Sequence, residues 1–549
     1  MKKVCAFSGQ EFEITEADLK FYEKLNVPPP TLCPDERMRR RLAFRNERNL
    51  YKRECALCEK SVISIYSPEK SFSLLCPDCW WSDKWDPFEY GRDFDFNCPF
   101  FEQFSELSEA IPHMAVNVVG NENCEYVSQT GYSKNCYLVF NTDFSEDCLY
   151  TTTVLYSKDC VDSLNLDHCE LCFECIDSSH CYNSQFLQNC QNCSDSLFLK
   201  NCIGCHHCFG SVNLRNKEYY FFNTSLSRPE WEEKIKNINL NSLSEQQQWK
   251  QKFEEQKLEF PHKFAEIKNC ENVTGDYLRN CKNTYHCFDC FGNEDVKHCA
   301  TFFDSKDCQD YCVGGYNASW CYEMASGGYN VFRCVFSSHV WTNDQDIFYS
   351  LQGITSSKDL FGCVSLRNAQ YCILNKQYSK EEYFRLREKI VEHMKKTGEW
   401  GEFFPITLSP FAYNETVAQE YFPLTKKEAL SRGYQWRDPD GKQYQAQTYT
   451  IPENIEQVLD SVCEQLLACR ECGKNYKIQK AELKFYRKMN IPIPQECPDC
   501  RHHNRMKLRN PRKLWQRECD QCGTEIQTTF APDRPEEVSC EKCYLNSIN

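Results

Sequence analysis

The central part of the chain alternates polar turns with short apolar runs at a fixed interval. Ser133-Lys-Asn-Cys136, Ser145-Glu-Asp-Cys148 and Ser157-Lys-Asp-Cys160 recur every twelve residues, and runs such as CYLVF (136–140) stand between them. Short strands with regular turns and a fixed period are typical of a β-solenoid, whose successive turns share a stacked core. Twelve residues fit either one thin turn or half of a thick one, and the pattern does not decide between them.

The repeat loosens toward Cys202 and then returns as Ser305-Lys-Asp-Cys308 and Ser357-Lys-Asp-Leu360. In a solenoid the recurring cysteines would form an interior ladder, because a thiol is small and Asn and Asp tolerate tight corners. The leucine in the last copy favours an apolar slot. A chain of metal ions is the competing interpretation, and its best candidate is the cluster Cys202, Cys205, His206, His207 and Cys208. Strand alternation argues against that cluster, since neighbouring side chains point to opposite faces.

The solenoid region is itself duplicated. Residues 209–231 match residues 361–383 after a shift of 152 positions, and in both copies an apolar run gives way to a helical pattern. Ser227 with Glu230, and Ser379 with Glu382, have the spacing of a capping box. The sequence therefore predicts helical segments at 227–263 and 380–398, which flank or cap each half of the solenoid.

Both ends of the chain carry paired cysteines instead of the repeat. The C-terminal pairs are Cys469/Cys472, Cys497/Cys500, Cys519/Cys522 and Cys540/Cys543. Cys-x-x-Cys pairs at this spacing are typical of structural zinc sites with four thiolate ligands.

The N-terminus repeats this module at an offset of 464 positions. Cys55, Cys58, Cys76 and Cys79 align with the last four cysteines of the chain, with the spacing C-x2-C-x17-C-x2-C in both copies. The other site has diverged, because only Cys5 and Cys33 remain while Ser8 and Glu36 replace two cysteines. Serine is a poor zinc ligand. We expect Cys5, Cys33 and Glu36 to form an empty or weak site, which leaves about three zinc ions.

The charge is unevenly distributed along the chain. The net charge is −15, while residues 1–82 carry +2 and residues 464–549 carry +4. Four thiolates around one zinc add a local charge of −2. Any basic surface must therefore be a local stripe, not a property of a whole module.

Each module holds such a basic stripe between its cysteine pairs. One interpretation is a solvated linker; the other is contact with the phosphates of a nucleic acid, with aromatic rings stacking on bases. The candidate residues are Arg41, Arg45, Arg48 and Tyr51 at the N-terminus, and Arg505, Lys507, Arg509, Arg512, Lys513 and Trp515 at the C-terminus.

An aromatic neck (79–107) joins the N-terminal module to the solenoid. Rings at this density favour docking of the module onto the body. A ligand-stacking platform made by Trp80, Trp81 and Trp85 is the alternative.

These patterns give the fold class and the boundaries. We expect a mainly β protein with flanking helices, in which a duplicated cysteine-ladder β-solenoid is bracketed by two zinc-ribbon or treble-clef-like modules. The expected units are an N-terminal module (1–82), a neck (83–115), a first half (116–226), a helical segment (227–268), a second half (269–378), a helix with a wrapped connector (379–462), and a C-terminal module (463–549).

Several classes of protein are disfavoured. The N-terminus has no apolar region of a secretion signal, and no run approaches 18 apolar residues. Forty cysteines then indicate a reducing cytoplasm, where thiols serve as ligands or small buried groups. Nucleotide-binding loops and the common hydrolase motifs are missing, and four-cysteine zinc sites are closed. An enzyme is therefore the less favoured class, and no catalytic residue is predicted.

Four segments of the sequence resemble a known family. They are CPDCRHHNRMKLRNPRKLWQREC, WWSDKWDPFEYGRDFDF, KEEYFRLREKIVEHMKKTGEWGEFFP and SPFAYNETVAQEYFPLT. They are similar to large zinc-ribbon, cysteine-repeat proteins of reduced-genome candidate-phylum bacteria. Some members carry the label CaiB/BaiF, after an acyl-CoA transferase family with a doubly wound α/β fold. This sequence has no βαβ alternation and does not support that label. The resemblance implies an architecture but no activity.

The sequence thus predicts a cytoplasmic zinc-binding scaffold. Its expected partners are RNA or a ribonucleoprotein at the basic stripes, or another protein on the solenoid face. The alternatives are an enzyme acting on the solenoid surface and a thiol-rich metal or redox buffer, which would need exposed cysteines.

Overall fold

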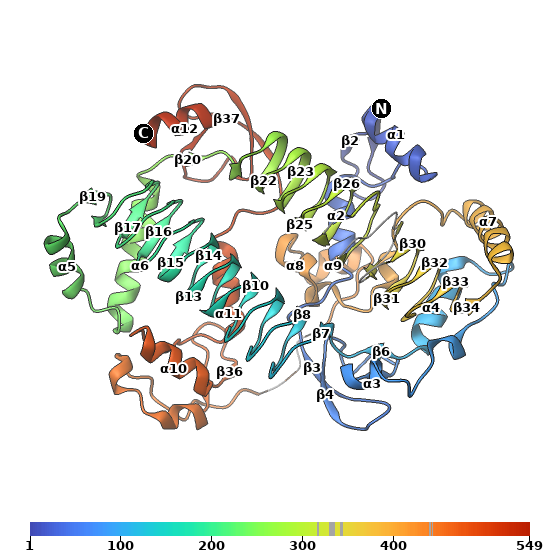
Figure 1. Ribbon diagram of the computed structural model, residues 1–549, viewed down its shortest axis with the longest axis horizontal. Coiled ribbons are helices and arrows are strands. Elements are labelled where there is room, and N and C mark those ends of the chain that lie inside the picture. Colours follow the sequence, from blue (N-terminus) through green and yellow to red (C-terminus); the bar gives the residue numbers. More distant parts are fainter. Residues whose placement is uncertain are drawn as a thin grey trace.

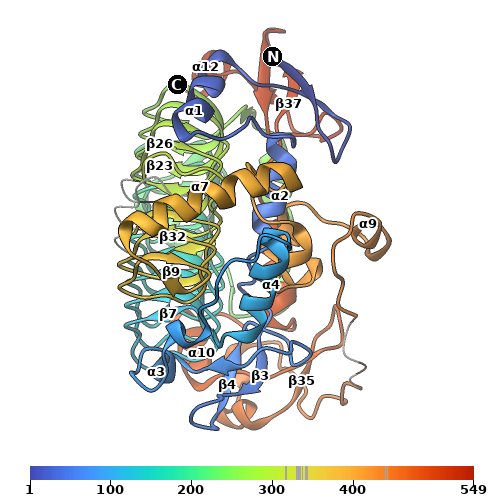
Figure 2. The same ribbon diagram turned by 90° about the vertical axis from the view of Figure 1, so that its right-hand side faces the viewer.

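The computed structural model describes residues 1–315, 318–328, 335–336, 338–340, 344–438, 441 and 443–548. It is a mainly β protein built around two β-solenoid halves, with cysteine-rich modules near both ends. Figure 1 shows the two halves diverging from the middle of the molecule, and Figure 2 shows their coils on one side with helices α2 and α4 on the other. Among the described residues, no helix is long and apolar enough to cross a membrane.

One turn of the solenoid takes twelve residues. Strands of successive turns pair in parallel at that interval, as Thr152 with Leu164 and Leu164 with Ile176. The thin-turn interpretation is therefore correct. The first half comprises β7 (Val118–Val119), β8 (Ser128–Gly131), β9 (Phe140–Asp143), β10 (Thr152–Leu155), β11 (Lys158–Val161), β12 (Leu164–Asp167), β13 (Glu170–Phe173), β14 (Ile176–Ser179), β15 (Tyr182–Gln188), β16 (Leu197–Lys200), β17 (Phe209–Val212), β18 (Tyr220–Phe221) and β19 (Thr224–Ser225).

The second half repeats this arrangement less regularly. Its strands are β21 (Ile267–Lys268), β22 (Glu271–Arg279), β23 (Lys282–Phe291), β24 (Glu294–Lys297), β25 (Ala300–Phe303), β26 (Lys306–Gln309), β27 (Cys312–Gly315), β28 (Gly327–Gly328), β29 (Ser338–Val340), β30 (Gln345–Phe348), β31 (Leu351–Ile354), β32 (Lys358–Phe361), β33 (Gln370–Ile373) and β34 (Lys376–Gln377). A bulge between Thr274 and Gly275 shifts the register of β22 against β23.

Each turn has four corners, because every third residue adopts a left-handed backbone conformation. In one turn these are Tyr156, Asp159, Asp162 and Asn165, with φ between 49° and 55°. Asn and Asp adopt this conformation at lower cost than other residues with a side chain, which explains their regular spacing. Corner amides of successive turns also bond one another, as Asn123 to Asn135 at 2.8 Å.

The residue after each corner points inward, and small polar side chains satisfy the carbonyl groups there. Cys148 Sγ donates to the carbonyl oxygens of Glu146 and Ser157 at 3.4 and 3.8 Å. Ser145 Oγ makes the same pair of bonds, to Asp143 and Val154, at 3.2 Å each. Cysteine and serine are thus interchangeable fillers of a narrow core, and Leu360 shows the apolar variant of the slot.

Helices follow each half where the capping boxes predict them. α7 (Lys380–Thr397) begins after Ser379, whose backbone amide and hydroxyl donate to Glu382, and ends at Gly398 with φ 77°. After the first half the predicted single segment is broken: α5 (Arg228–Lys236) and α6 (Leu243–Leu258) are separate helices. A second N-cap begins α6, where the Glu245 amide donates a hydrogen bond to Ser242 Oγ. The interruption has no proline or glycine signal in residues 237–242.

The two terminal modules have the same order of elements. The N-terminal module contains β1 (Lys2–Val4), β2 (Glu11–Glu13), α1 (Glu16–Leu25), α2 (Pro34–Leu42), β3 (Tyr51–Glu54), β4 (Ser61–Ser64), β5 (Leu74–Leu75) and α3 (Pro77–Trp80). The C-terminal module contains β35 (Leu467–Ala468), β36 (Asn475–Tyr476), α10 (Lys480–Lys488), α11 (Pro498–Lys507), β37 (Trp515–Glu518), β38 (Glu525–Thr528), β39 (Val538–Ser539) and α12 (Glu541–Ile548).

Each module spans both solenoid halves. In the N-terminal module β5 pairs with β6 (His113–Met114) at the entry to the first half, while α2 contacts the second half at Asp310 and Glu323. In the C-terminal module β39 pairs with β20 (His262–Lys263) at the entry to the second half, while α11 contacts the first half at Asp162. The duplicated chain therefore closes on itself with approximate two-fold correspondence.

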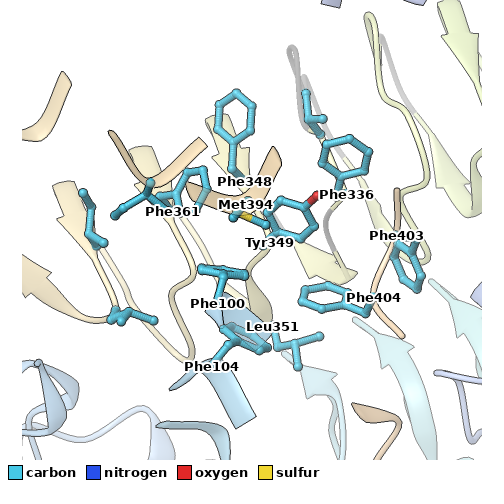
Figure 3. Packing of buried hydrophobic residues seen from close by; sticks show 14 of the residues in the cluster. Phe100, Phe104, Phe336, Phe348, Tyr349, Leu351, Phe361, Met394, Phe403 and Phe404 are labelled. Carbon is cyan, nitrogen blue, oxygen red and sulfur yellow. The ribbon is translucent and has the colours of Figure 1, made fainter. Parts of the chain in front are cut away.

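The aromatic neck docks onto the end of the second half. Phe100 and Phe104 of α4 (Phe100–Ala110) are fully buried, and the Phe100 ring centroid lies 5.3 Å from those of Tyr349 and Phe361. Figure 3 shows this cluster between α4 and the strands, with Phe404 of the connector closing it. The docking interpretation is confirmed for these rings. Trp81 remains 39% exposed.

The connector from α7 to the C-terminal module is largely irregular. Its described residues form short helices only: α8 (Val417–Tyr421), α9 (Lys426–Ser431) and 3₁₀ turns at Ile406–Leu408, Tyr413–Glu415, Ile455–Gln457 and Asp460–Glu464. A further 3₁₀ turn, Pro87–Tyr90, lies in the neck.

Candidate metal centres and the arginine clamp

Three groups of four cysteines come together among the described residues. They are Cys55, Cys58, Cys76 and Cys79; Cys469, Cys472, Cys497 and Cys500; and Cys519, Cys522, Cys540 and Cys543. In each group the four sulfur atoms lie within 4.8 Å of one another. The twelve residues predicted as ligands are thus brought together in the predicted quartets, and each quartet can hold a metal ion.

Local backbone geometry favours a thiolate at the first cysteine of each quartet, where the pKa is lowered. The Cys76 amide donates to Cys55 Sγ at 3.3 Å, and the Cys540 amide donates to Cys519 Sγ at 3.2 Å. Burial raises the pKa of Cys55, but the amides of Cys76, Cys58 and Leu57 outweigh it and lower the pKa to about 6. A thiol that ionises near neutral pH is a ready metal ligand.

The fourth predicted position is not a comparable group. Ser8 Oγ lies 3.8 Å from Cys33 Sγ, where the aligned site has a pair of sulfur atoms. The Glu36 carboxylate is turned away to Arg39, with both oxygens within 2.6 Å of the guanidinium Nη1. Cys5, Cys33 and Glu36 therefore do not converge on one point as the three quartets do.

The cluster at 202–208 also separates. Cys202, Cys205 and Cys208 point into the buried core, whereas His206 is exposed and accepts or donates a bond with Ser194 Oγ at 2.9 Å. His207 stacks on Tyr219. Its cysteines and histidines lie on opposite sides of the solenoid wall, as alternation predicts.

The basic stripe of the C-terminal module is buried against the solenoid. Arg501 and Arg505 both bind Asp162 of the first half, and their side chains are 6% and 4% exposed. Arg509 then bridges the two halves: its Nε donates to Asp177 at 2.9 Å, and its Nη2 donates to Asp289. We call Arg501, Arg505, Arg509 and Arg512 the arginine clamp.

Asp289 is the point at which this clamp holds the second half. Arg512 donates to its Oδ2 at 2.7 Å and also bonds Thr301 at 2.6 Å. Burial raises the pKa of Asp289, but Arg509 and Arg512 outweigh it, so the pKa lies below its ordinary value. The carboxylate is therefore ionised, and the two guanidinium groups compensate its negative charge.

The N-terminal stripe repeats the arrangement on the other half. Arg37 and Arg41 bind Asp310 at 3.0 and 3.1 Å, and Arg40 binds Glu323 at 2.6 Å. After the 464-residue shift, Arg37 and Arg41 occupy the places of Arg501 and Arg505. The two basic stripes are therefore equivalent docking surfaces.

These contacts correct the expected role of five of the ten nucleic-acid candidates. Arg41, Arg45, Arg505, Arg509 and Arg512 are all at least 91% buried. The guanidinium groups of four of them, Arg41, Arg505, Arg509 and Arg512, bond acidic corners of the solenoid, which the sequence could not place opposite them. Arg45 bonds Glu47, Ser326 and Asn141. These five arginines present no basic surface to a phosphate.

The remaining five nucleic-acid candidates form two groups, one in contact with other parts of the protein and one nearer the surface. Arg48 is 12% exposed in its side chain and bonds Thr152, and Tyr51 is half-buried and donates to Glu415. Lys507 and Lys513 are exposed, and the ammonium group of Lys513 lies 5.1 Å from the centroid of the half-buried Trp515 ring.

The sequence analysis missed a groove between the two halves. Two cavities of about 460 and 260 Å³ share Leu155 and Phe303 in their walls, so they adjoin. Along the first half the groove follows a stack of corner rings: Tyr132, Phe144, Tyr156, His168 and His180. These rings recur every twelve residues, and from that periodicity the wall of the groove could have been predicted.

Comparisons with protein-family models, with curated proteins and with solved structures found no match. The function of this protein must therefore be inferred from its three cysteine quartets, its buried arginine clamp and its groove.

Proposed function

We propose that this protein is a zinc-stabilised binding scaffold in which the terminal modules lock two solenoid halves around a ligand groove. The observation that carries the proposal is Arg509, which lies in a cysteine-closed module and bonds a carboxylate of each half. The function of the metal is then structural, and the groove is the surface that binds.

The donor set fits zinc. A tetrahedral ion with Zn–S bonds of about 2.3 Å places its sulfur ligands roughly 3.8 Å apart. Cys58 and Cys76 are 3.9 Å apart, Cys472 and Cys497 are 3.7 Å apart, and Cys522 and Cys540 are 3.8 Å apart. Four thiolates form a closed site that orders a small module and leaves no open position for a substrate.

A metal or redox buffer is less well supported. In the solenoid, all described cysteines except Cys124 and Cys270 are buried. Their thiols donate to main-chain carbonyls, and burial raises the pKa of Cys287 and Cys299 well above that of a free thiol. Such groups neither ionise nor meet solvent readily.

Metal analysis of the purified, reduced protein tests the structural proposal. We expect three zinc ions per chain by native mass spectrometry. Chelation should lower the thermal midpoint and expose the clamp. A protein that purifies without metal and keeps its melting temperature in chelator would contradict the proposal.

An RNA partner remains a separate proposal, now narrowed to the exposed residues of the C-terminal stripe. We expect the double substitution Lys507→Gln and Lys513→Gln to weaken RNA binding and reduce its salt slope by about 2. Lys480→Gln with Lys484→Gln, on α10 of the same module, is the control. RNA affinity that is equal in the two double variants would exclude this surface.

A further inference from the structure

The smaller cavity in the groove has the walls of a selective pocket. Its volume is about 260 Å³, and its apolar walls come from Trp81, Val118, Tyr132, Leu155 and Phe303. The walls therefore combine the neck and both solenoid halves. Neutral polar residues, among them Asn117, Gln129, Asn141 and Ser326, also line the cavity. A concave site that combines apolar walls with a set of polar groups is the usual form of a small-ligand site.

One carboxylate, that of Asp143, stands in this wall without a matching cation among the residues that the structure describes. Of these residues, Asp143 and Arg45 are the charged ones that line the cavity. Arg45 is already satisfied, because it bonds Glu47 at 2.5 Å, Ser326 at 2.6 Å and Asn141 at 3.1 Å. Burial raises the pKa of Asp143 to about 6, although the Gly131 amide and Arg45 act in the opposite direction. A cation from outside would remove this electrostatic cost.

Aromatic rings beside Asp143 offer the other half of a cation site. Tyr132 is 54% exposed and stacks on Phe144 with centroids 5.2 Å apart and planes 8° apart. Because more than half of the Tyr132 surface is exposed, part of its ring stays open to a ligand. The face of an aromatic ring attracts a positive charge.

We propose that the cavity binds an alkylammonium group, with its charge at Asp143 and its carbon chain against Tyr132, Leu155 and Phe303. The inference rests on the proposed function, since it names the ligand chemistry of the same groove. A phosphate or other anion is excluded by the carboxylate. The alkylammonium group can belong to a free polyamine or to a lysine side chain of a partner protein.

Calorimetric titration of the full chain tests this with n-butylammonium chloride and its neutral isostere, n-butanol. We expect saturable binding of the ammonium at one site and at least tenfold weaker binding of the alcohol. Asp143→Asn should weaken ammonium binding at least tenfold. Asp307→Asn is the control, because Asp307 is an exposed corner residue of the solenoid that lines neither cavity of the groove, and it should leave the affinity unchanged.

The affinity should also fall with acid. With a pKa of about 6 in the free protein, Asp143 is ionised at pH 7.5 and mostly protonated at pH 5, which predicts a loss of roughly tenfold. The other charged group at the cavity among the described residues is Arg45, and its partner Glu47 faces Arg45. The Asp143→Asn variant should show no such dependence.

Two further titrations identify the source of the group. Spermidine binding without binding of an acetylated lysine tripeptide assigns the site to a free polyamine, and the reverse assigns it to a protein side chain. Equal binding of butanol and butylammonium, or undiminished binding by Asp143→Asn, would overturn the inference. Tyr132→Leu provides a second variant that should also weaken binding.

Failure here is separable from failure of the scaffold proposal. If the protein contains three zinc ions and an intact clamp but does not bind butylammonium, only the assignment of an alkylammonium ligand is contradicted. A chain without zinc contradicts the proposed function itself.

Discussion

Cysteine in the solenoid acts at the residue scale as a small hydrogen-bonding filler. Cys148 and Ser145 bond equivalent carbonyl pairs, two residues before and nine residues after themselves. The abundance of cysteine therefore reflects the narrow core of a twelve-residue turn. Within the described part of the chain, only the quartets gather sulfur atoms as metal sites do.

Replacing a ladder cysteine should show this equivalence. We expect Cys148→Ser to change the free energy of unfolding by less than about 1 kcal/mol, and Cys148→Ala to cost about 1–2 kcal/mol, because alanine leaves the carbonyls unpaired. Urea titration measures both. Zinc content should stay unchanged in both variants; a lost metal ion would show that the ladder binds metal.

Arg509 should be among the most sensitive single positions. Arg509→Met leaves Asp177 without its cation and Asp289 with Arg512 alone, and it should destabilise the protein by about 3–5 kcal/mol. Arg487→Met is the control, because the pair of Arg487 with Asp460 is 43% and 86% exposed and is worth less than about 1 kcal/mol. Equal denaturation midpoints for the two variants would show that the clamp contributes nothing.

At the element scale, sequence patterns predicted those features that depend on residues close together along the chain. The twelve-residue repeat, the capping boxes of Ser227 and Ser379, and the cysteine quartets all follow from neighbours along the chain. The basic stripes could not be interpreted in the same way. Their partners, such as Asp162 and Asp310, lie more than 250 residues away and look like ordinary corner residues. Without knowledge of its acidic partners, a basic segment of a sequence is interpreted as an exposed surface.

The groove was missed for a related reason. The ring column from Tyr132 to His180 belongs to the solenoid surface, and only the packing of one half beside the other turns that surface into a wall. The two halves meet through the modules, whose placement is tertiary information.

The two modules should differ in metal content. Cys519→Ser should lower the zinc count from three to two per chain, because it removes one ligand of a complete quartet. Cys5→Ser, at the diverged site, should leave three. Native mass spectrometry makes the comparison, and a loss of one ion in both variants would establish a fourth site.

Buried histidines dominate the acid response of the whole molecule. Burial lowers the pKa of His113 and His502 to about 4, and that of His262 and His298 to about 3. The unfolded chain takes up these protons below its ordinary histidine pKa of about 6.5, so stability is present above that pH and lost below it.

Carboxyl groups with a raised pKa oppose this trend. Burial raises the pKa of Asp143 to about 6 and that of Asp276 to about 7, and it also raises the pKa of Asp177, Asp304, Glu323 and Glu482, so the folded state gains protons there as the pH falls. We expect the four histidines to outweigh these carboxyls, so that stability falls from pH 6 to pH 5. Urea titrations across this range test the slope, and His298→Gln should reduce it by about 1.4 kcal/mol per unit. Stability that is constant or rises toward pH 5 would contradict the assignment.

The whole-molecule claim is that metal-closed modules hold the two solenoid halves together. Hydrogen exchange of the intact protein, with and without chelator, tests it most directly. The account predicts that chelation removes protection from the terminal modules and from the contacts of Asp162, Asp177 and Asp289, while the interior of each solenoid half stays protected. Unchanged protection at these corners after complete removal of the metal would contradict it.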